Sequence, residues 1–98
     1  MIHREEIAAL CKKHHVQRLA IFGSFVREDF DPARSDVDLL VEFAPLSPAV
    51  YAPNYFALLE ALDQLFSRRV DLVTASSIRN PYFREAVDKE QQTLYAAA

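Results

Sequence analysis

The sequence is poor in cysteine and glycine. It contains one cysteine, Cys11, and one glycine, Gly23, in 98 residues. A single cysteine excludes an intrachain disulfide. Cys11 falls on the apolar stripe of an expected helix with Ile7 and Leu10, so we expect it to pack in the core. The chain also lacks an apolar run long enough to cross a bilayer, and it lacks a signal-peptide pattern. These absences favour a protein of the reducing cytoplasm, with no membrane partner.

The sequence also lacks a large excess of charge of either sign. The 14 acidic and 11 basic residues are mixed along the chain and give a net charge of −3. No basic stripe is present to neutralise a long run of phosphates, so we expect no extended nucleic-acid partner. Hydrophobic residues make up 51% of the chain, which is enough for one core. Two cores would each bury too little surface, so we expect a single domain over residues 1–98.

Hydrophobic periodicity predicts both helices and strands. Apolar residues three and four apart are typical of helices, and strict alternation is typical of half-buried strands. In residues 36–43 the odd-numbered side chains are all apolar, and Leu40 is the one exception on the other face. The pattern predicts helices over residues 4–14, 24–30 and 54–66 and a last helix from residue 81, and strands over residues 18–22, 36–43 and 70–74. These elements indicate an α/β (α+β) domain.

Prolines indicate two boundaries in the second half of the chain. Pro45, Pro48 and Pro53 lack the amide hydrogen that a helix interior needs. We therefore expect an irregular connection up to Asn54, which would cap the helix that follows. Asn80 followed by proline is typical of a helix start. In that last helix we expect inward-facing Phe83, Ala86, Val87 and Leu94.

Aspartates stand in two of the predicted strands, where this residue type is disfavoured. Asp36 and Asp38 are two residues apart and project from one face, with backbones about 6.5–7 Å apart. Asp71 repeats the pattern in the last predicted strand. Gathered carboxylates of this kind could share divalent cations. Taken singly, Asp36 could cap a strand edge and Asp38 could face solvent. Asp71 could pair with Arg68 or Arg69.

A Gly-Ser pair follows the first predicted strand. Gly23 would let the backbone approach a ligand closely, and the Ser24 hydroxyl with the next helix N-terminus would offer hydrogen-bond donors. Such a turn suits a polyphosphate. The alternative is an ordinary turn with Ser24 as a helix cap. Its coincidence with three aspartates favours a site for a nucleotide and metal ions.

Three segments, in this order, resemble one known family. Residues 21–27, 35–41 and 70–73 carry a Gly-Ser pair, an Asp-x-Asp and a distant single aspartate. They closely resemble the minimal nucleotidyltransferase (MNT) branch of the DNA polymerase beta superfamily, as found in antitoxins of HEPN/MNT toxin–antitoxin pairs. The resemblance spans nearly the whole chain. It implies the nucleotidyltransferase fold, a small mixed sheet of at least three strands packed against helices.

The same resemblance implies a magnesium-dependent reaction of ATP. Asp36 and Asp38 would hold two Mg²⁺ ions, and Asp71 would complete the ion that activates the acceptor hydroxyl. Gly23 and Ser24 would bind the β and γ phosphates. Arg27 would counter the charge of the leaving pyrophosphate.

The sequence departs from the family pattern at two places. Phe25 to Ser35 make eleven residues between the Gly-Ser pair and the Asp-x-Asp, one more than relatives commonly have. A longer surface loop is tolerable. Glu28 stands where relatives usually carry glycine. A negative charge there would weaken triphosphate binding if it faced the site.

The short chain length bears on the acceptor, because we expect no room for a separate acceptor-binding domain. The catalytic scaffold uses all 98 residues, so an acceptor surface must come from elsewhere. The resemblance implies an antitoxin that adds AMP to a tyrosine of a HEPN-type ribonuclease toxin, in a hetero-oligomer. Two alternatives remain open, namely a non-catalytic antitoxin and a nucleotidyltransferase that acts on a small molecule or tRNA. Tyr51 and Tyr82 are candidates for an interface or for peripheral core packing.

Overall fold

The computed structural model describes residues 4–22 and 37–97. The predictions for Gly23, Ser24, Arg27 and Asp36, and for a helix over residues 24–30, lie outside the described residues. The other predicted elements can all be compared with the structure.

A four-stranded mixed sheet forms the centre of the molecule, with the strand order β3-β2-β1-β4. The strands are β1 (Val16–Phe22), β2 (Val37–Phe43), β3 (Val70–Thr74) and β4 (Gln92–Ala96). Strand β1 is antiparallel to both β2 and β4, whereas β2 and β3 are parallel. The prediction of a small mixed sheet packed against helices is therefore confirmed, with β4 as a strand that was not predicted.

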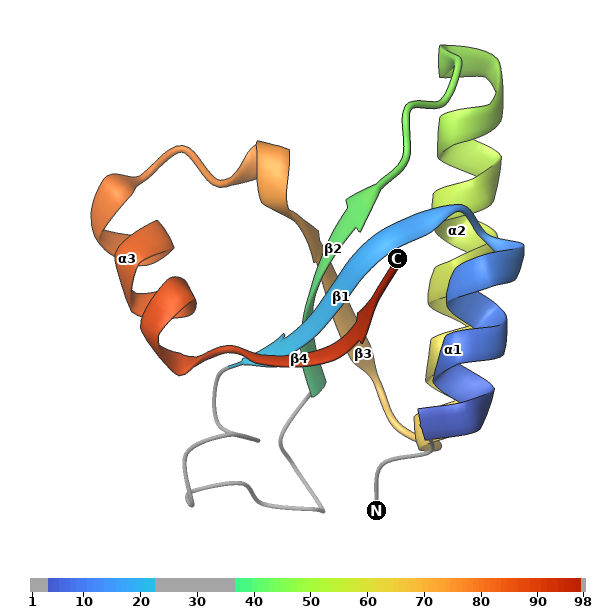
Figure 1. Ribbon diagram of the computed structural model, residues 1–98, viewed down its shortest axis with the longest axis horizontal. Helices are drawn as coiled ribbons and strands as arrows, with labels where there is room; N and C mark the ends of the chain where they lie inside the picture. Colours follow the sequence, from blue (N-terminus) through green and yellow to red (C-terminus); the bar gives the residue numbers. More distant parts are fainter. Residues whose placement is uncertain (1–3, 23–36, 98) are drawn as a thin grey trace.

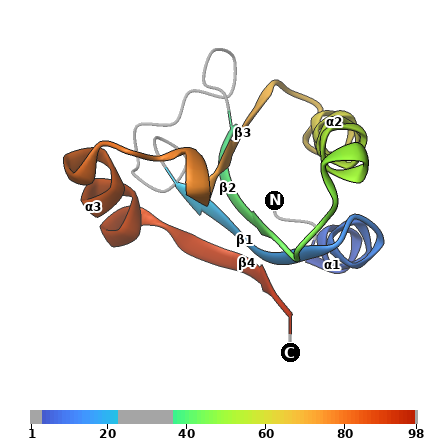
Figure 2. The same ribbon diagram turned by 90° about the horizontal axis from the view of Figure 1, so that it is seen from above.

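Helices cover both faces of this sheet. Helices α1 (Arg4–Lys13) and α2 (Pro48–Phe66) lie together on one face, and α3 (Pro81–Glu90) lies on the other with the 3-10 helix η2 (Ala75–Ser77) (Figures 1 and 2). No helix in the described part of the chain is long and apolar enough to cross a membrane.

Two apolar clusters follow from this layering. The larger lies between the sheet and the pair α1 and α2, and it includes Cys11, which is fully buried. The smaller lies on the α3 side and includes Leu40 with Phe22 and Val87. Leu40 breaks the two-residue period because the sheet is covered on both faces, so an apolar side chain is also buried on the second one.

Helix α2 begins earlier than the proline pattern predicted. The expected irregular connection up to Asn54 is wrong, because the helix starts at Pro48 and contains Pro53. Pro48 takes the first helical position, where an amide hydrogen has no helical partner in any case. Pro53 lies in the second turn, where only one helical hydrogen bond is lost. Asn54 caps nothing, and its Nδ2 instead donates to the His14 carbonyl oxygen at 2.7 Å.

The start of α3 agrees with the prediction, but its end does not. The Asn80 side chain accepts hydrogen bonds from the amides of Tyr82 and Phe83, at 2.9 and 3.3 Å. Leu94, expected on the inner face of this helix, lies on β4 and is buried in the larger cluster. The helix ends because Gln91 is extended, with φ −66 and ψ 146, which returns the chain to the sheet beside β1. Of the other predicted inward residues, Val87 is buried and Phe83 is 46% exposed, while Ala86 is exposed.

Candidate active site

Two of the three predicted metal ligands are brought together by the sheet. Asp38 and Asp71 are the second residues of β2 and β3, and they are direct partners in the parallel register. Partners on neighbouring strands lie about 4.8 Å apart and project from the same face. Asp38 is half-buried and Asp71 is exposed. Their neighbours Val37 and Leu72 point into the larger cluster, so both carboxylates lie on the opposite, α3 side of the sheet.

Phe22 borders the carboxylate pair on its other side. It is the last residue of β1, and its register partner is Asp38. Its ring packs edge to face against Phe83 of α3, with centroids 6.3 Å apart and an interplanar angle of 73°. Gly23 follows Phe22 directly in the sequence, and Asp36 directly precedes the first residue of β2. The chain therefore leaves β1 and enters β2 at the end of these strands where Phe22 and Asp38 lie.

Hydrogen bonds hold the strand segments that carry the two aspartates. The amide of Val37 donates to the Arg69 carbonyl oxygen at 3.0 Å, which ties the starts of β2 and β3 together. The amide of Val70 donates to Asp63 Oδ1 of α2 at 2.8 Å. One residue beyond Asp71, the Leu72 carbonyl oxygen accepts a hydrogen bond from the Tyr55 hydroxyl of α2.

Burial and the nearby negative charge of Asp71 both raise the pKa of the Tyr55 phenol. The pKa of Tyr55 is raised above its ordinary value of 10.0, first by burial and then by the negative charge of Asp71, with a smaller effect from Tyr51. Tyr55 therefore remains a protonated hydrogen-bond donor at neutral pH. Helix α2 and the carboxylate pair are thus electrostatically as well as structurally connected.

The donor set suits a hard divalent cation. Asp38 and Asp71 supply two carboxylates, and Mg²⁺ is commonly held by one or two carboxylates together with phosphate oxygens and waters. Among residues 4–22 and 37–97 no group of three His, Cys, Asp or Glu side chains could hold a metal ion. The third predicted ligand, Asp36, lies outside those ranges. Its convergence with the other two stays a prediction, as do the roles of Gly23, Ser24 and Arg27.

Comparison with known proteins decides the family. Residues 4–93 match the family described as nucleotidyltransferase domain. The chain belongs to this family. A relative from Methanocaldococcus jannaschii, provisionally named a protein adenylyltransferase, is 33% identical over 91% of this chain and 87% of its own length. A solved structure, provisionally described as a minimal nucleotidyltransferase, is 34% identical with a TM-score of 0.74, covering 91% of this chain and 86% of its own.

Two solved toxin–antitoxin complexes share the fold of this nucleotidyltransferase. One, determined with AMP-PNP, is 22% identical with a TM-score of 0.70 over 98% of this chain and 75% of its own. The other is the complex of a tri-AMPylated HEPN toxin of Shewanella oneidensis with an MNT antitoxin. The matching chain of that complex is 21% identical with a TM-score of 0.62, over 96% of this chain and 70% of its own length. The resemblance to minimal nucleotidyltransferases is confirmed.

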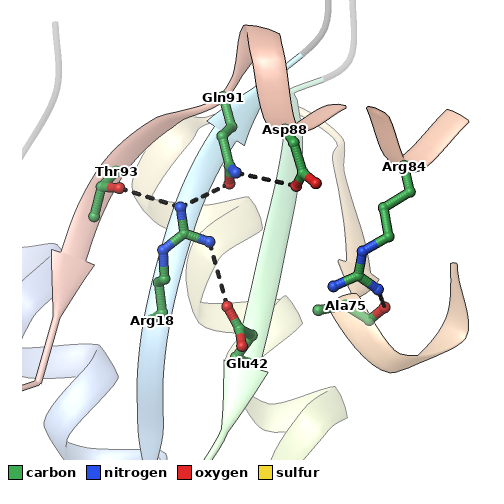
Figure 3. Close-up of polar contacts among 7 residues, drawn as sticks. All are labelled: Arg18, Glu42, Ala75, Arg84, Asp88, Gln91 and Thr93. Atoms are coloured by element: carbon green, nitrogen blue, oxygen red, sulfur yellow. Dashed lines mark hydrogen bonds and ion pairs between the residues drawn. The ribbon is translucent and has the colours of Figure 1, made fainter. Parts of the chain in front are cut away.

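A second polar cluster of the nucleotidyltransferase lies at the far end of the same face. The Arg18 guanidinium of β1 donates to Glu42 at 3.3 Å, to Gln91 at 2.9 Å and to Thr93 at 3.4 Å (Figure 3). Arg18 pairs with Glu42, four residues along β1 from Phe22, so it lies about 13 Å from the aspartate row. Arg18 thus ties β1 and β2 to the segment between α3 and β4.

Sequence reasoning missed Asp63 and Tyr55. Both lie on α2, and their partners are the amide before Asp71 and the carbonyl after it. A weak signal existed for Asp63, because it and Glu60 are the two carboxylates of a mainly apolar helix and Asp63 directly follows the core residue Leu62. Tyr55 carries no sequence signal beyond its place in the predicted helix over residues 54–66. Its hydroxyl partner depends on how α2 packs over β3, which periodicity does not report.

Proposed function

We propose that this nucleotidyltransferase moves AMP from ATP to a tyrosine hydroxyl of a partner HEPN-type ribonuclease toxin and so acts as its cytoplasmic antitoxin. The observation that carries the proposal is the direct pairing of Asp38 with Asp71, beside the end of the strand that leads into Gly23 and Ser24. The names of the relatives support a protein acceptor. The AMPylated toxin bound to an MNT antitoxin supports a HEPN-type partner.

The reaction is an in-line displacement at the α-phosphorus. The acceptor oxygen forms a bond to phosphorus, the bond to the bridging oxygen breaks, and pyrophosphate leaves while the hydroxyl proton passes to water. Asp36, Asp38 and Asp71 would hold Mg²⁺, which supplies charge stabilisation at the attacking and leaving oxygens. Ser24 with Gly23 would bind the β and γ phosphates, and Arg27 would face the leaving group.

Two residues on α2 hold the backbone around Asp71. Asp63 holds the amide of Val70, and Tyr55 holds the carbonyl of Leu72, so the backbone is fixed on both sides of Asp71. A held backbone limits the reorganisation at Asp71 to its side-chain torsions when a cation binds, and pre-organised charge favours stabilisation of a transition state.

The test is transfer of label from ATP to the co-purified HEPN-type partner in the presence of Mg²⁺. We expect Asp36→Asn, Asp38→Asn and Asp71→Asn each to lower the transfer rate by about 100- to 1,000-fold, the cost of losing a group that stabilises transition-state charge. Complex formation should survive in all three variants. Asp88→Asn is the matched control, because this exposed aspartate of α3 contacts Gln91, away from the pair.

The two outcomes separate catalysis from simple binding. Loss of label transfer with retained complex supports the proposal. If wild-type protein transfers no label and the Asp38→Asn variant neutralises the toxin equally well, the chain is a non-catalytic antitoxin. Label on tRNA or a small molecule, with none on the partner, would replace the protein acceptor.

A further inference from the structure

An apolar groove runs over the outer edge of β3, which is an edge strand of the sheet formed by residues 4–22 and 37–97. It encloses about 460 Å³, within the range of about 300–1,000 Å³ for ligand sites. Helix α2 forms one wall, and β3 with η2 forms the other. The lining residues are Tyr51, Ala52, Tyr55, Phe56, Leu72, Val73, Thr74 and Ser77. None of these side chains carries a charge at neutral pH, and three of them are aromatic.

The groove begins at Leu72, the residue that follows Asp71; Asp71 itself is not one of the lining residues. Leu72 follows Asp71 in β3, and the phenol of Tyr55 senses the Asp71 charge. Leu72 lines the groove from the α2 side of the sheet, and Val73 lines it from the side that carries Asp71. An occupant that extends beyond the Leu72 end of the groove, across the edge of β3, would therefore approach Asp71.

The order of groups across the sheet separates the two substrates. The segment that leads to Gly23 and Ser24 leaves β1, Asp38 lies on the middle strand, and Asp71 lies on the edge strand β3. If Gly23 and Ser24 bind the triphosphate, as the resemblance implies, it would approach from the β1 side. The outer side of Asp71 is the β3 edge, where the groove lies.

Charge complementarity selects the occupant of the groove. The lining contains no basic residue to bind a nucleotide phosphate, and its uncharged aromatic surface suits a neutral aromatic side chain. Phe56 at the groove is 63% exposed, and its ring packs edge to face on Tyr55 with centroids 5.2 Å apart. Exposed aromatic side chains beside a groove are typical anchors for a protein partner.

The outer edge of β3 does not favour binding by strand addition at this point. An edge strand normally offers unpaired carbonyl and amide groups to a partner strand. Here the Leu72 carbonyl oxygen already accepts the Tyr55 hydroxyl. A partner would therefore contact the groove through its side chains.

We propose that this groove binds the acceptor-bearing segment of the partner protein and presents its tyrosine hydroxyl to Asp71. The inference rests on the proposed function, because it takes AMP transfer to a protein as the reaction of the carboxylate pair. It adds the surface that selects the acceptor.

The test uses Phe56→Glu, which places a charge at the exposed side of the groove. We expect the KM for the HEPN-type partner to rise about tenfold or more, as when an interface anchor is lost. The kcat at saturating partner and the affinity for AMP-PNP should be unchanged. Ala52→Gln is a second variant that narrows the groove with a residue favourable in helices, and it should act in the same direction.

Tyr82→Glu is the matched control, because Tyr82 is an 82% exposed aromatic of α3 that does not line the groove. Its KM should stay within about twofold of wild type. If wild type transfers label and both groove variants keep the wild-type KM, the groove inference is wrong although the function stands. A larger effect at Tyr82, or weaker AMP-PNP binding in the groove variants, also overturns it. No transfer by wild type would instead contradict the proposed function.

Discussion

Asp38 and Asp71 bring two carboxylates side by side on neighbouring strands. Like charges directly opposite each other in a sheet are destabilising, and the cost is tolerable where a cation is bound between them. This pair could be predicted from the sequence because aspartate is out of place in a Val/Leu-rich strand. The hydrogen bonds from Asp63 and Tyr55 could not, because they depend on the packing of α2 over β3.

Asp71→Asn tests the electrostatic cost of the pair without measuring activity. We expect the free energy of unfolding in the presence of EDTA to rise by about 0.2–1 kcal/mol, because one member of a like-charged pair is removed. Urea denaturation followed by circular dichroism measures the change.

Added Mg²⁺ should reverse this order by stabilising the wild type more than the variant, since a ligand bound only by the folded state stabilises it. A variant less stable than wild type in EDTA would show that Asp71 contributes a favourable native contact, and would contradict the prediction.

At the scale of elements, local signals succeeded where they concerned one residue and its near neighbours. Asn80-Pro81 marks the start of α3 in both sequence and structure. The proline pattern predicts too late a start for α2. Pro48 does not break this helix, because it occupies a position in the first turn. Strand β4 was missed because residues 92–96 are too short for a clear period and gain their partner, β1, from the far end of the chain.

The cap of α3 can be tested by Asn80→Ala. The substitution removes the acceptor for the Tyr82 and Phe83 amides and should lower the free energy of unfolding by about 1 kcal/mol. Asn80→Asp is the control, because a carboxylate can accept the same hydrogen bonds and should keep nearly wild-type stability. Urea denaturation compares the three proteins. Equal losses in both variants would show that the side-chain amide has another role.

At the scale of the whole molecule, the two faces of the sheet have different tasks. The face toward α1 and α2 holds the larger cluster, and the α3 face holds the carboxylate pair together with the smaller cluster. Alternation along β2 assigns neighbouring residues to these tasks, with Leu39 fully buried on one side and Asp38 on the other. The fold class was predictable because this alternation can be recognised within a short stretch of sequence. The third carboxylate and the phosphate-binding turn remain predictions from sequence.

Leu39→Ala should therefore lower stability, whereas Asp38→Asn should lower activity. A domain of this size has a stability of about 5–15 kcal/mol, and Leu39→Ala should remove about 2–5 kcal/mol of it by leaving a cavity in the larger cluster. At low temperature, the fraction that remains folded should still transfer AMP at close to the wild-type rate per folded molecule. Asp38→Asn should leave the unfolding midpoint equal to or slightly above that of the wild type, because it removes one member of the like-charged pair, and should lose transfer. Calorimetry and label transfer on the same samples compare the two. If the folded fraction of Leu39→Ala transferred AMP much more slowly than wild type, the two faces of the sheet would be coupled. The core around Leu39 would then contribute to the site.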